Sequence, residues 1–183
     1  MTRSARIIAR HLGLPAIAAA ALLSLVPSAK ADVSSTAFKN IFVRTDATVR
    51  TIGESNLFTP VPNMSVGVFT VPEGDTQLFT VLYTAQAELR DASTSVDTFN
   101  SDDVLELQLL AVKTTGATII LSPLGPAAFA SENSPQAHAL SWSGRLSAGF
   151  YTFKLMARVR DFAPTGTVSG SLSNAMLTIT RYD

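Results

Sequence analysis

Strict alternation of apolar and polar residues in two long stretches constrains the fold of this chain more than any other feature. In the stretch 148–160, AGFYTFKLMARVR, one set of alternate positions is apolar and the other is polar or basic. The apolar set is Tyr151, Phe153, Leu155, Ala157 and Val159, and the other set includes Lys154, Arg158 and Arg160. The stretch 79–89 alternates in the same way. Because successive side chains of a β-strand point to opposite faces, the pattern predicts two long strands that are each buried on one face.

Shorter runs of the same kind predict the remaining strands. They cover 38–44, 48–52, 66–71, 104–112, 117–121, 138–146 and 175–182. Turn-forming residues predict two hairpins, one through Pro72-Glu73-Gly74-Asp75 and one through Thr114-Thr115-Gly116. About nine strands separated by turns predict an all-β fold, an antiparallel β-sandwich of jelly-roll-like type. The proline-containing segment 122–136 is expected to be a long surface loop.

The first 31 residues have the three parts of a secretory signal peptide. Arg3, Arg6 and Arg10 precede an apolar run over 12–26, and the small-residue site Ala29-Lys30-Ala31 follows it. This run is shorter than the roughly 20 residues of a membrane-spanning helix, so we expect cleavage before Asp32 and not a retained anchor. Residues 1–31 are therefore interpreted as a signal peptide and 32–183 as a single β-sandwich domain, secreted or periplasmic. The absence of cysteine excludes disulfides and a lipid-anchored cysteine.

The charge balance argues against nucleic acid as a partner. The whole chain has 14 basic and 14 acidic residues, and the leader holds four of the basic ones and no acid, so the mature chain carries a net charge of −4. Proteins that bind nucleic acid gather an excess of lysine and arginine on one face. The expected partner is therefore a carbohydrate or a protein of the cell envelope.

Few residues offer catalytic chemistry. His138 is the one histidine after the leader, and no G-x-S-x-G motif supplies a serine nucleophile for it. The glycines match neither a dinucleotide fingerprint nor a phosphate-binding loop. The sequence therefore favours a non-catalytic protein, with His138 as a packed strand residue.

The segment 91–103 concentrates hard oxygen ligands. Asp97, Asn100, Asp102 and Asp103 are candidate calcium ligands, because calcium takes six to eight oxygens. The spacing is not that of an EF-hand, and the same residue types also cap their own backbone in turns. A third interpretation is that two carboxylates of the chain act as an acid and base pair on a glycosidic bond. No cofactor other than calcium is indicated.

The basic face of 148–160 and three aromatic residues are the candidate ligand contacts. We expect Lys154, Arg158 and Arg160 to face solvent and to pair with acids such as Glu88 or Glu106 on neighbouring strands. If they lack such partners, they would mark a site for an acidic glycan or another subunit. Phe99, Phe129 and Trp142 are the aromatic candidates for contact with a sugar or a protein.

These patterns lead to one main functional hypothesis and two alternatives. The main hypothesis is an exported, non-catalytic binding or structural protein of the bacterial envelope or extracellular matrix, acting through surface loops or self-association. Homo-oligomers are plausible because Val104, Leu110 and Val112 place apolar side chains on the outer face of their strand. The alternatives are a glycan-processing enzyme with paired carboxylates and a small outer-membrane β-barrel.

Overall fold

The computed structural model describes residues 33–37, 40–91, 103–131, 133–162 and 168–182. All of its strands lie within one compact unit, Ala31–Asp183. The strands are β1 (Val33–Ala37), β2 (Ile41–Asp46), β3 (Arg50–Gly53), β4 (Thr59–Asp91), β5 (Val104–Lys113), β6 (Thr118–Ile120), β7 (Ala127–Ala130), β8 (Gln136–Arg160) and β9 (Val168–Tyr182). All pair antiparallel in the order β1-β2-β9-β4-β8-β5-β6, while β3 pairs with β9 and β7 with β5. The predicted antiparallel sandwich of jelly-roll-like type is confirmed.

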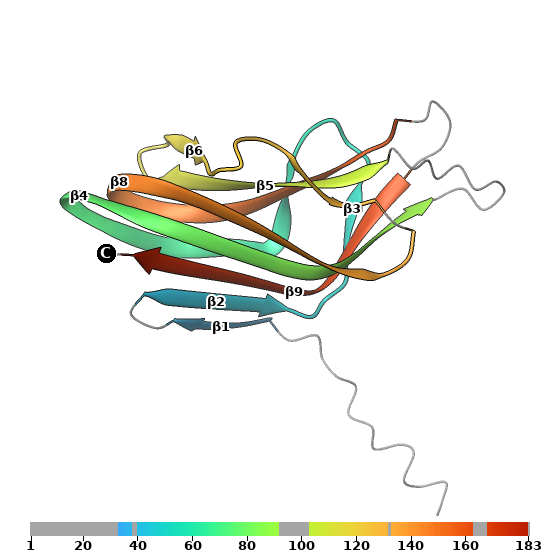
Figure 1. Cartoon of the computed structure of the whole chain (residues 1–183), viewed down its shortest axis with the longest axis horizontal. Coiled ribbons are helices and arrows are strands. Elements are labelled where there is room, and N and C mark those ends of the chain that lie inside the picture. Colours follow the sequence, from blue (N-terminus) through green and yellow to red (C-terminus); the bar gives the residue numbers. More distant parts are fainter. Residues whose placement is uncertain (1–32, 38–39, 92–102, 132, 163–167, 183) are drawn as a thin grey trace, which may run out of the picture. The chain divides into compact units, whose positions relative to one another are not determined.

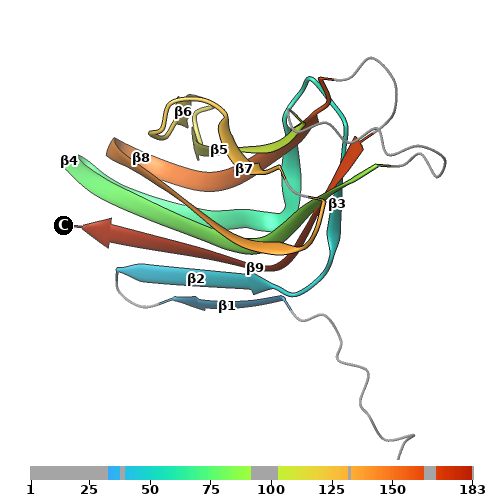
Figure 2. The same ribbon diagram turned by 45° about the vertical axis from the view of Figure 1, so that its right-hand side comes forward.

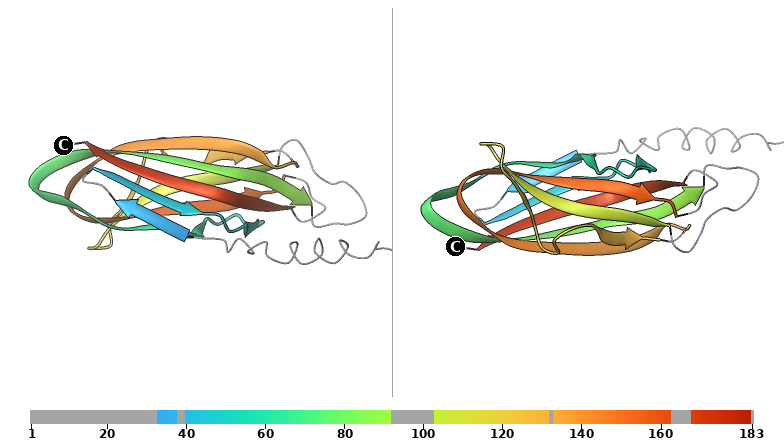
Figure 3. Two further views of the ribbon diagram at one scale, coloured as in Figure 1. Left: turned by 90° about the horizontal axis from the view of Figure 1, so that it is seen from below. Right: turned by 90° about the horizontal axis from the view of Figure 1, so that it is seen from above.

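Two long strands, β4 and β8, belong to both layers of the sandwich. Their segments 76–87 and 136–147 pair with each other next to β9, and this layer continues through β2 to β1. Their segments 59–71 and 149–157 pair in the second layer, which continues through β5 to β6 and β7. Both strands turn over between the layers at the left of Figure 1. The left panel of Figure 3 shows the first layer face on, and Figure 2 shows β7 beside β5.

The turnover of β4 corrects one predicted hairpin. Pro72–Asp75 does not reverse the chain, because β4 has the same partner on both sides of it: Val71 pairs with Gly149, and Thr76 pairs with Ser147. The extra residues of β4 form an irregular bend in the ladder, where Gly74 adopts a φ of 84°. A β-bulge of this kind bends a strand without ending it. For the same reason 138–146 and 148–160 are two halves of β8 and not two strands.

The core lies between the layers and is made by the alternate residues that the sequence pattern places inward. Tyr151, Phe153, Leu155, Ala157 and Val159 are all buried. Leu105, Leu107, Leu109 and Ala111 of β5 are buried in the same layer. Phe153 packs against Phe79 of the first layer with ring centroids 5.4 Å apart, and Phe69 contacts both rings. Aromatic contacts of this geometry stabilise the packing of the two layers.

The second predicted hairpin is present, whereas the predicted long loop contains a strand. The hairpin through Thr114-Thr115-Gly116 is confirmed, because Leu110 pairs with Ile120 and Gly116 adopts a φ of 94°. The segment 122–136 is not entirely loop, since it contains β7. No helix in the described part of the chain has the length and apolar character needed to cross a bilayer.

Candidate functional site

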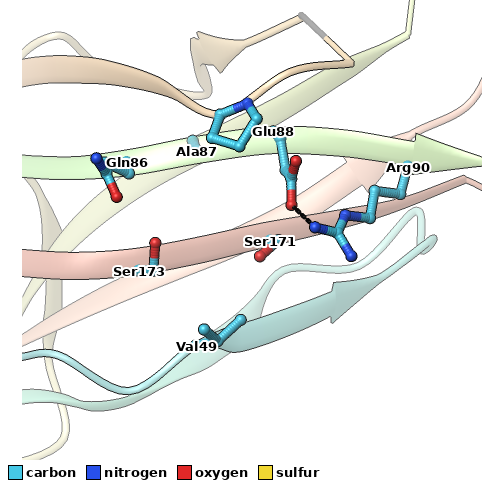
Figure 4. Close-up of a pocket in the computed structure, with 8 residues that line it drawn as sticks. Val49, Gln86, Ala87, Glu88, Arg90, Ser171 and Ser173 are labelled. Carbon is cyan, nitrogen blue, oxygen red and sulfur yellow. Dashed lines mark ion pairs between the residues drawn. The ribbon is translucent and has the colours of Figure 1, made fainter. Parts of the chain in front are cut away.

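A polar depression on the outer face of the first layer is the candidate functional site. Its volume is about 200 Å³, and the strands β4 and β9 form its floor. It is lined by Val49, Gln86, Ala87, Glu88, Arg90, Pro135, Ser171 and Ser173. Figure 4 shows Gln86 and Glu88 reaching from β4 toward the two serines of β9.

The register of the sheet explains why the surface is hollow here. Glu88 lies opposite Ser171, and Gln86 lies opposite Ser173. Each long polar side chain of β4 therefore faces a serine, whose short side chain leaves space above β9. Val49, before β3, and Pro135, before β8, form the walls. The floor is rigid because both of its strands are inner strands of the sheet.

Glu88 is the central group of the depression. It is only 7% exposed although it lies on the outer face of the sheet. A buried carboxylate is stable only when it is paired or hydrogen-bonded, and Glu88 forms an ion pair through Oε1 with Nη2 of Arg90. The Arg90 side chain is 67% exposed, so it covers the carboxylate from the solvent side. Among the described residues no donor is bound to the second oxygen, Oε2.

Comparison with two other buried carboxylates shows what is unusual about Glu88. Both oxygens of Glu106 are bound, by Arg158 Nε at 2.5 Å and by Arg160 Nη1 at 3.5 Å. Both oxygens of Asp46 are bound as well, by the backbone N–H of Thr48 and by Arg50. Glu88 therefore keeps acceptor capacity that the others have already used, and this capacity lies in a depression.

A bulge in β9 adds an amide pair beside Glu88. Asn174 adopts a φ of 49°, a left-handed conformation that asparagine tolerates better than most residues. Its Nδ2 donates a hydrogen bond of 2.7 Å to Oε1 of Gln86. Since this bond occupies the carbonyl oxygen of Gln86, its NH₂ group is oriented as a donor at the edge of the depression.

The wall residue Val49 is held in place by Asp46. Oδ1 of Asp46 accepts a hydrogen bond from Thr48 N at 2.9 Å, and Oδ2 accepts from Arg50 Nε at 3.0 Å and from Asn63 Nδ2 at 3.3 Å. Burial opposes ionisation of Asp46, but these hydrogen bonds outweigh it and hold the pKa of the carboxyl below its usual value. The connection from β2 to β3 is thereby fixed next to the depression.

A second depression adjoins this connection but offers less chemistry. Its volume is about 180 Å³, and its lining includes Asp46, Asn174 and Met176. The Asp46 carboxylate is already committed to internal donors on both oxygens. The depression at Glu88 is therefore the stronger candidate.

The predicted basic face of 148–160 is mostly engaged in internal contacts. Glu106 lies opposite Arg158 in the ladder and pairs with both Arg158 and Arg160, which confirms the predicted partner. Glu88 pairs with Arg90 instead. Arg158 also stacks on Phe58, and Arg160 stacks on Phe162, with distances of 4.6 and 4.4 Å to the ring centroids. Lys154 lies opposite Leu110 without an acid partner among the described residues.

Two of the three aromatic candidates are not exposed. Phe129 is 5% exposed and Trp142 is 1% exposed, so neither presents a ring to a ligand. The expectation that Phe129 is exposed is wrong, because it lies on β7 and packs against Tyr83 and His138. His138 itself is half-buried, in keeping with a packed strand residue. Phe99 lies outside the described residues.

The predicted calcium ligands fall mainly outside the described residues. Asp97, Asn100 and Asp102 are not described. Asp103 is fully buried, and its Oδ1 accepts a hydrogen bond of 3.0 Å from the backbone N–H of Phe162. This contact joins the residue before β5 to the segment after β8, 59 residues away, so it is a long-range tertiary contact and not the local capping of a turn. No group of three or more acidic, histidine or cysteine residues suited to a metal occurs in the described ranges.

Sequence reasoning missed most of the depression. The sequence predicts Glu88 only as a partner for the basic face of 148–160, and it does not single out Gln86, Arg90, Ser171 or Ser173. One signal was available, since Gln86, Glu88 and Arg90 are three successive outward positions of a strand. The pairing of those positions with the serines depends on the strand order β9-β4, which the sequence does not reveal.

No protein-family model and no curated protein matches the sequence. Three solved structures of infectious bursal disease virus resemble the chain distantly. The Gx strain matches with a TM-score of 0.46 and 10% identity over 76% of this chain and 31% of that chain. The Gt strain matches with a TM-score of 0.41 and 9% identity over 76% and 31%, and the VP2 subviral particle with 0.40 and 9% over 78% and 38%. The chain thus spans about a third of the length of the chains it matches.

Proposed function

We propose that this chain is an exported, non-catalytic binding protein of the bacterial envelope or extracellular matrix, and that the depression at Glu88 binds one unit of a saccharide. The observation that carries the proposal is the buried Glu88 carboxylate, which keeps one oxygen without a donor at the base of a surface depression. Such an oxygen gains a charge-assisted hydrogen bond when a ligand hydroxyl donates to it.

The other lining groups and the size of the depression suit the same ligand class. Ser171 and Ser173 offer hydroxyls that both donate and accept, and the Gln86 amide offers a donor. Pockets that enclose drug-sized ligands measure roughly 300 to 1,000 Å³. A volume of about 200 Å³ accommodates less, such as a single sugar unit or the end of a glycan chain.

Binding without cleavage is favoured over glycan processing. Glycosidases of the common type need two carboxyl groups that flank the scissile bond. Glu88 is the one carboxylate among the described residues that line the depression. Its partner there is Arg90, which supplies charge compensation and no second acid.

The proposal is tested by binding of residues 32–183 to a broad glycan array, once with calcium and once with a chelator. This unit is suitable because all described strands lie within it. We expect binding that does not depend on calcium and that Glu88→Gln weakens about tenfold or more, since a charged acceptor becomes a neutral one. Glu73→Gln is the matched control, because Glu73 is an exposed acid of the β4 bend outside the depression.

Three outcomes would count against the proposal. Binding that Glu88→Gln leaves unchanged would place the site elsewhere on the surface. Binding that is lost on chelation would instead favour a calcium site at Asp97, Asn100, Asp102 and Asp103. An array without any bound glycan would overturn the saccharide and direct attention to a protein partner or to self-association.

A further inference from the structure

We infer that the depression selects uncharged saccharide units over acidic and amine-bearing ones, and that Arg90 is the residue that sets this selectivity. The inference deepens the proposed function and rests on it. It comes from the charges that line the depression and from the unequal burial of the two charged side chains.

The lining has no net charge. Glu88 and Arg90 are its one acid and its one base, and Val49, Gln86, Ala87, Pro135, Ser171 and Ser173 are neutral. Arg50, which follows the wall residue Val49 in sequence, is committed to Asp46 through two hydrogen bonds. A charged ligand therefore gains no long-range attraction from the depression, whereas a neutral ligand needs none.

The positions of the two charges discriminate between ligand classes. The Glu88 carboxylate lies at the base and repels an acidic sugar that enters the depression. Arg90 lies at the rim and already neutralises the carboxylate through Oε1, so the ammonium group of an amine-bearing sugar would lose its hydration without gaining an uncompensated charge to pair with. A neutral hydroxyl can donate to the remaining oxygen without disturbing the ion pair. The pair thus accepts hydroxyl groups and disfavours ligands of either charge.

Removal of Arg90 reverses part of this selectivity. Glu88 then remains buried without its compensating charge, and a ligand ammonium group can replace the lost guanidinium. Close charge pairs at binding sites contribute enough to change affinity tenfold or more. The preference of an Arg90→Gln variant should therefore shift toward amine-bearing sugars, whereas Arg90→Lys should retain the preference for neutral ones.

The test compares half-saturation on an array that carries neutral, amine-bearing and carboxylate-bearing glycans. Residues 32–183 are used in the natural form and as Arg90→Gln, Arg90→Lys and Arg145→Gln. Arg145 is an exposed arginine of β8 outside the depression, so its loss changes the total charge alone. Thermal melting by circular dichroism confirms that each variant is folded.

We expect the natural form to bind neutral glycans at least tenfold more tightly than charged ones, with less than a twofold change between 20 and 500 mM salt, since a net-neutral contact is not screened. Arg90→Gln should move the ratio of amine-bearing to neutral binding at least tenfold, and Arg145→Gln should leave it unchanged. A natural form that prefers charged glycans, or an equal shift in both variants, would overturn the inference and leave the proposed function intact. If no glycan on the array binds, both the inference and the proposed function are overturned.

Discussion

At the scale of single residues, three buried carboxylates carry most of the charge chemistry: Glu88 and Glu106 lie on outer faces of the sandwich, whereas Asp46 lies on the inward face of β2, opposite Ala175. Asp46, Glu88 and Glu106 each pair with an arginine, which removes most of the cost of burying the charge. Asp46 and Glu106 have a partner at each of their two oxygens, which gives them a structural role. Glu88 retains an acceptor oxygen, and this difference is why we propose it as the binding group.

The stability contributed by Asp46 should depend on pH. Its pKa is lower in the folded chain than its usual value, because hydrogen bonds from Thr48, Arg50 and Asn63 outweigh the effect of burial. A carboxyl of this kind stabilises the fold above its unfolded pKa of about 3.9, and the contribution is lost as the pH falls through the folded pKa. Asp46→Asn should therefore lower the free energy of unfolding by about 2 kcal/mol at pH 7.

Urea denaturation between pH 3 and pH 7 checks this prediction. The difference between the natural form and Asp46→Asn should narrow as the pH falls below about 4. A difference that is the same across the range would show that the hydrogen bonds to Asp46 do not depend on its charge.

Tyr83 carries a buried hydroxyl without a hydrogen-bond partner among the described residues. Burial, with a contribution from the charge of Asp46, raises the pKa of this hydroxyl. Because an unsatisfied buried polar group costs free energy, Tyr83→Phe should leave stability unchanged or raise it by up to about 1 kcal/mol. Tyr151→Phe is the control, since Tyr151 donates a 2.9 Å hydrogen bond to the Ser147 carbonyl and should lose about 1 kcal/mol. Equal losses in both variants, measured by chemical denaturation, would contradict the assignment.

At the scale of elements, the alternation in the sequence predicts faces better than it predicts strand ends. Every inward residue expected in 148–160 is buried, because a period of two residues leaves no other arrangement when one face is apolar. The breaks at Pro72–Asp75 and at 147–149 suggest turns but are bends within β4 and β8. Whether such a segment reverses or only bends depends on the partner strand, which local sequence does not specify.

Two short strands have weak local signals. β1 and β7 have five and four residues, and neither shows a long alternating pattern. Their strand character comes from pairing with β2 and β5. The candidate site is hard to predict for a related reason, since its two halves are 81 or more residues apart in sequence and meet only because β9 pairs with β4.

The close approach of the layers at β9 depends on Gly170. A Cβ atom at this position would lie 2.9 Å from Val159 and 3.1 Å from Leu105, both in the core of the opposite layer. Gly170→Ala should therefore destabilise the fold by about 1 to 3 kcal/mol through overpacking. Gly53→Ala is the matched control, because Gly53 is on the adjacent strand and a Cβ added there would meet no atom within 4 Å. Equal melting temperatures for the two variants would show that close packing at Gly170 does not limit stability.

At the scale of the whole molecule, the two bent strands join the layers into one unit. Loss of packing in either layer is therefore expected to unfold both in a single transition. The rigid outer face of the first layer then serves as a platform for the depression.

Export through the leader stays a prediction. The positive start, the apolar run and the site Ala29-Lys30-Ala31 predict that the full chain, expressed in a bacterium, is released with Asp32 as its first residue. Intact mass and N-terminal sequencing of the product check this. Retention of residues 1–31 in the accumulated protein would contradict it.

An NMR titration of ¹⁵N-labelled residues 32–183 with the strongest glycan of the array decides whether the depression at Glu88 is the binding site. We predict that backbone amide shifts concentrate at Gln86, Glu88 and Arg90 of β4 and at Ser171 and Ser173 of β9, and that Glu88→Gln suppresses them. Shifts concentrated instead on the face of Leu110, Ile120 and Lys154, or in the segment 92–102, would contradict the claim.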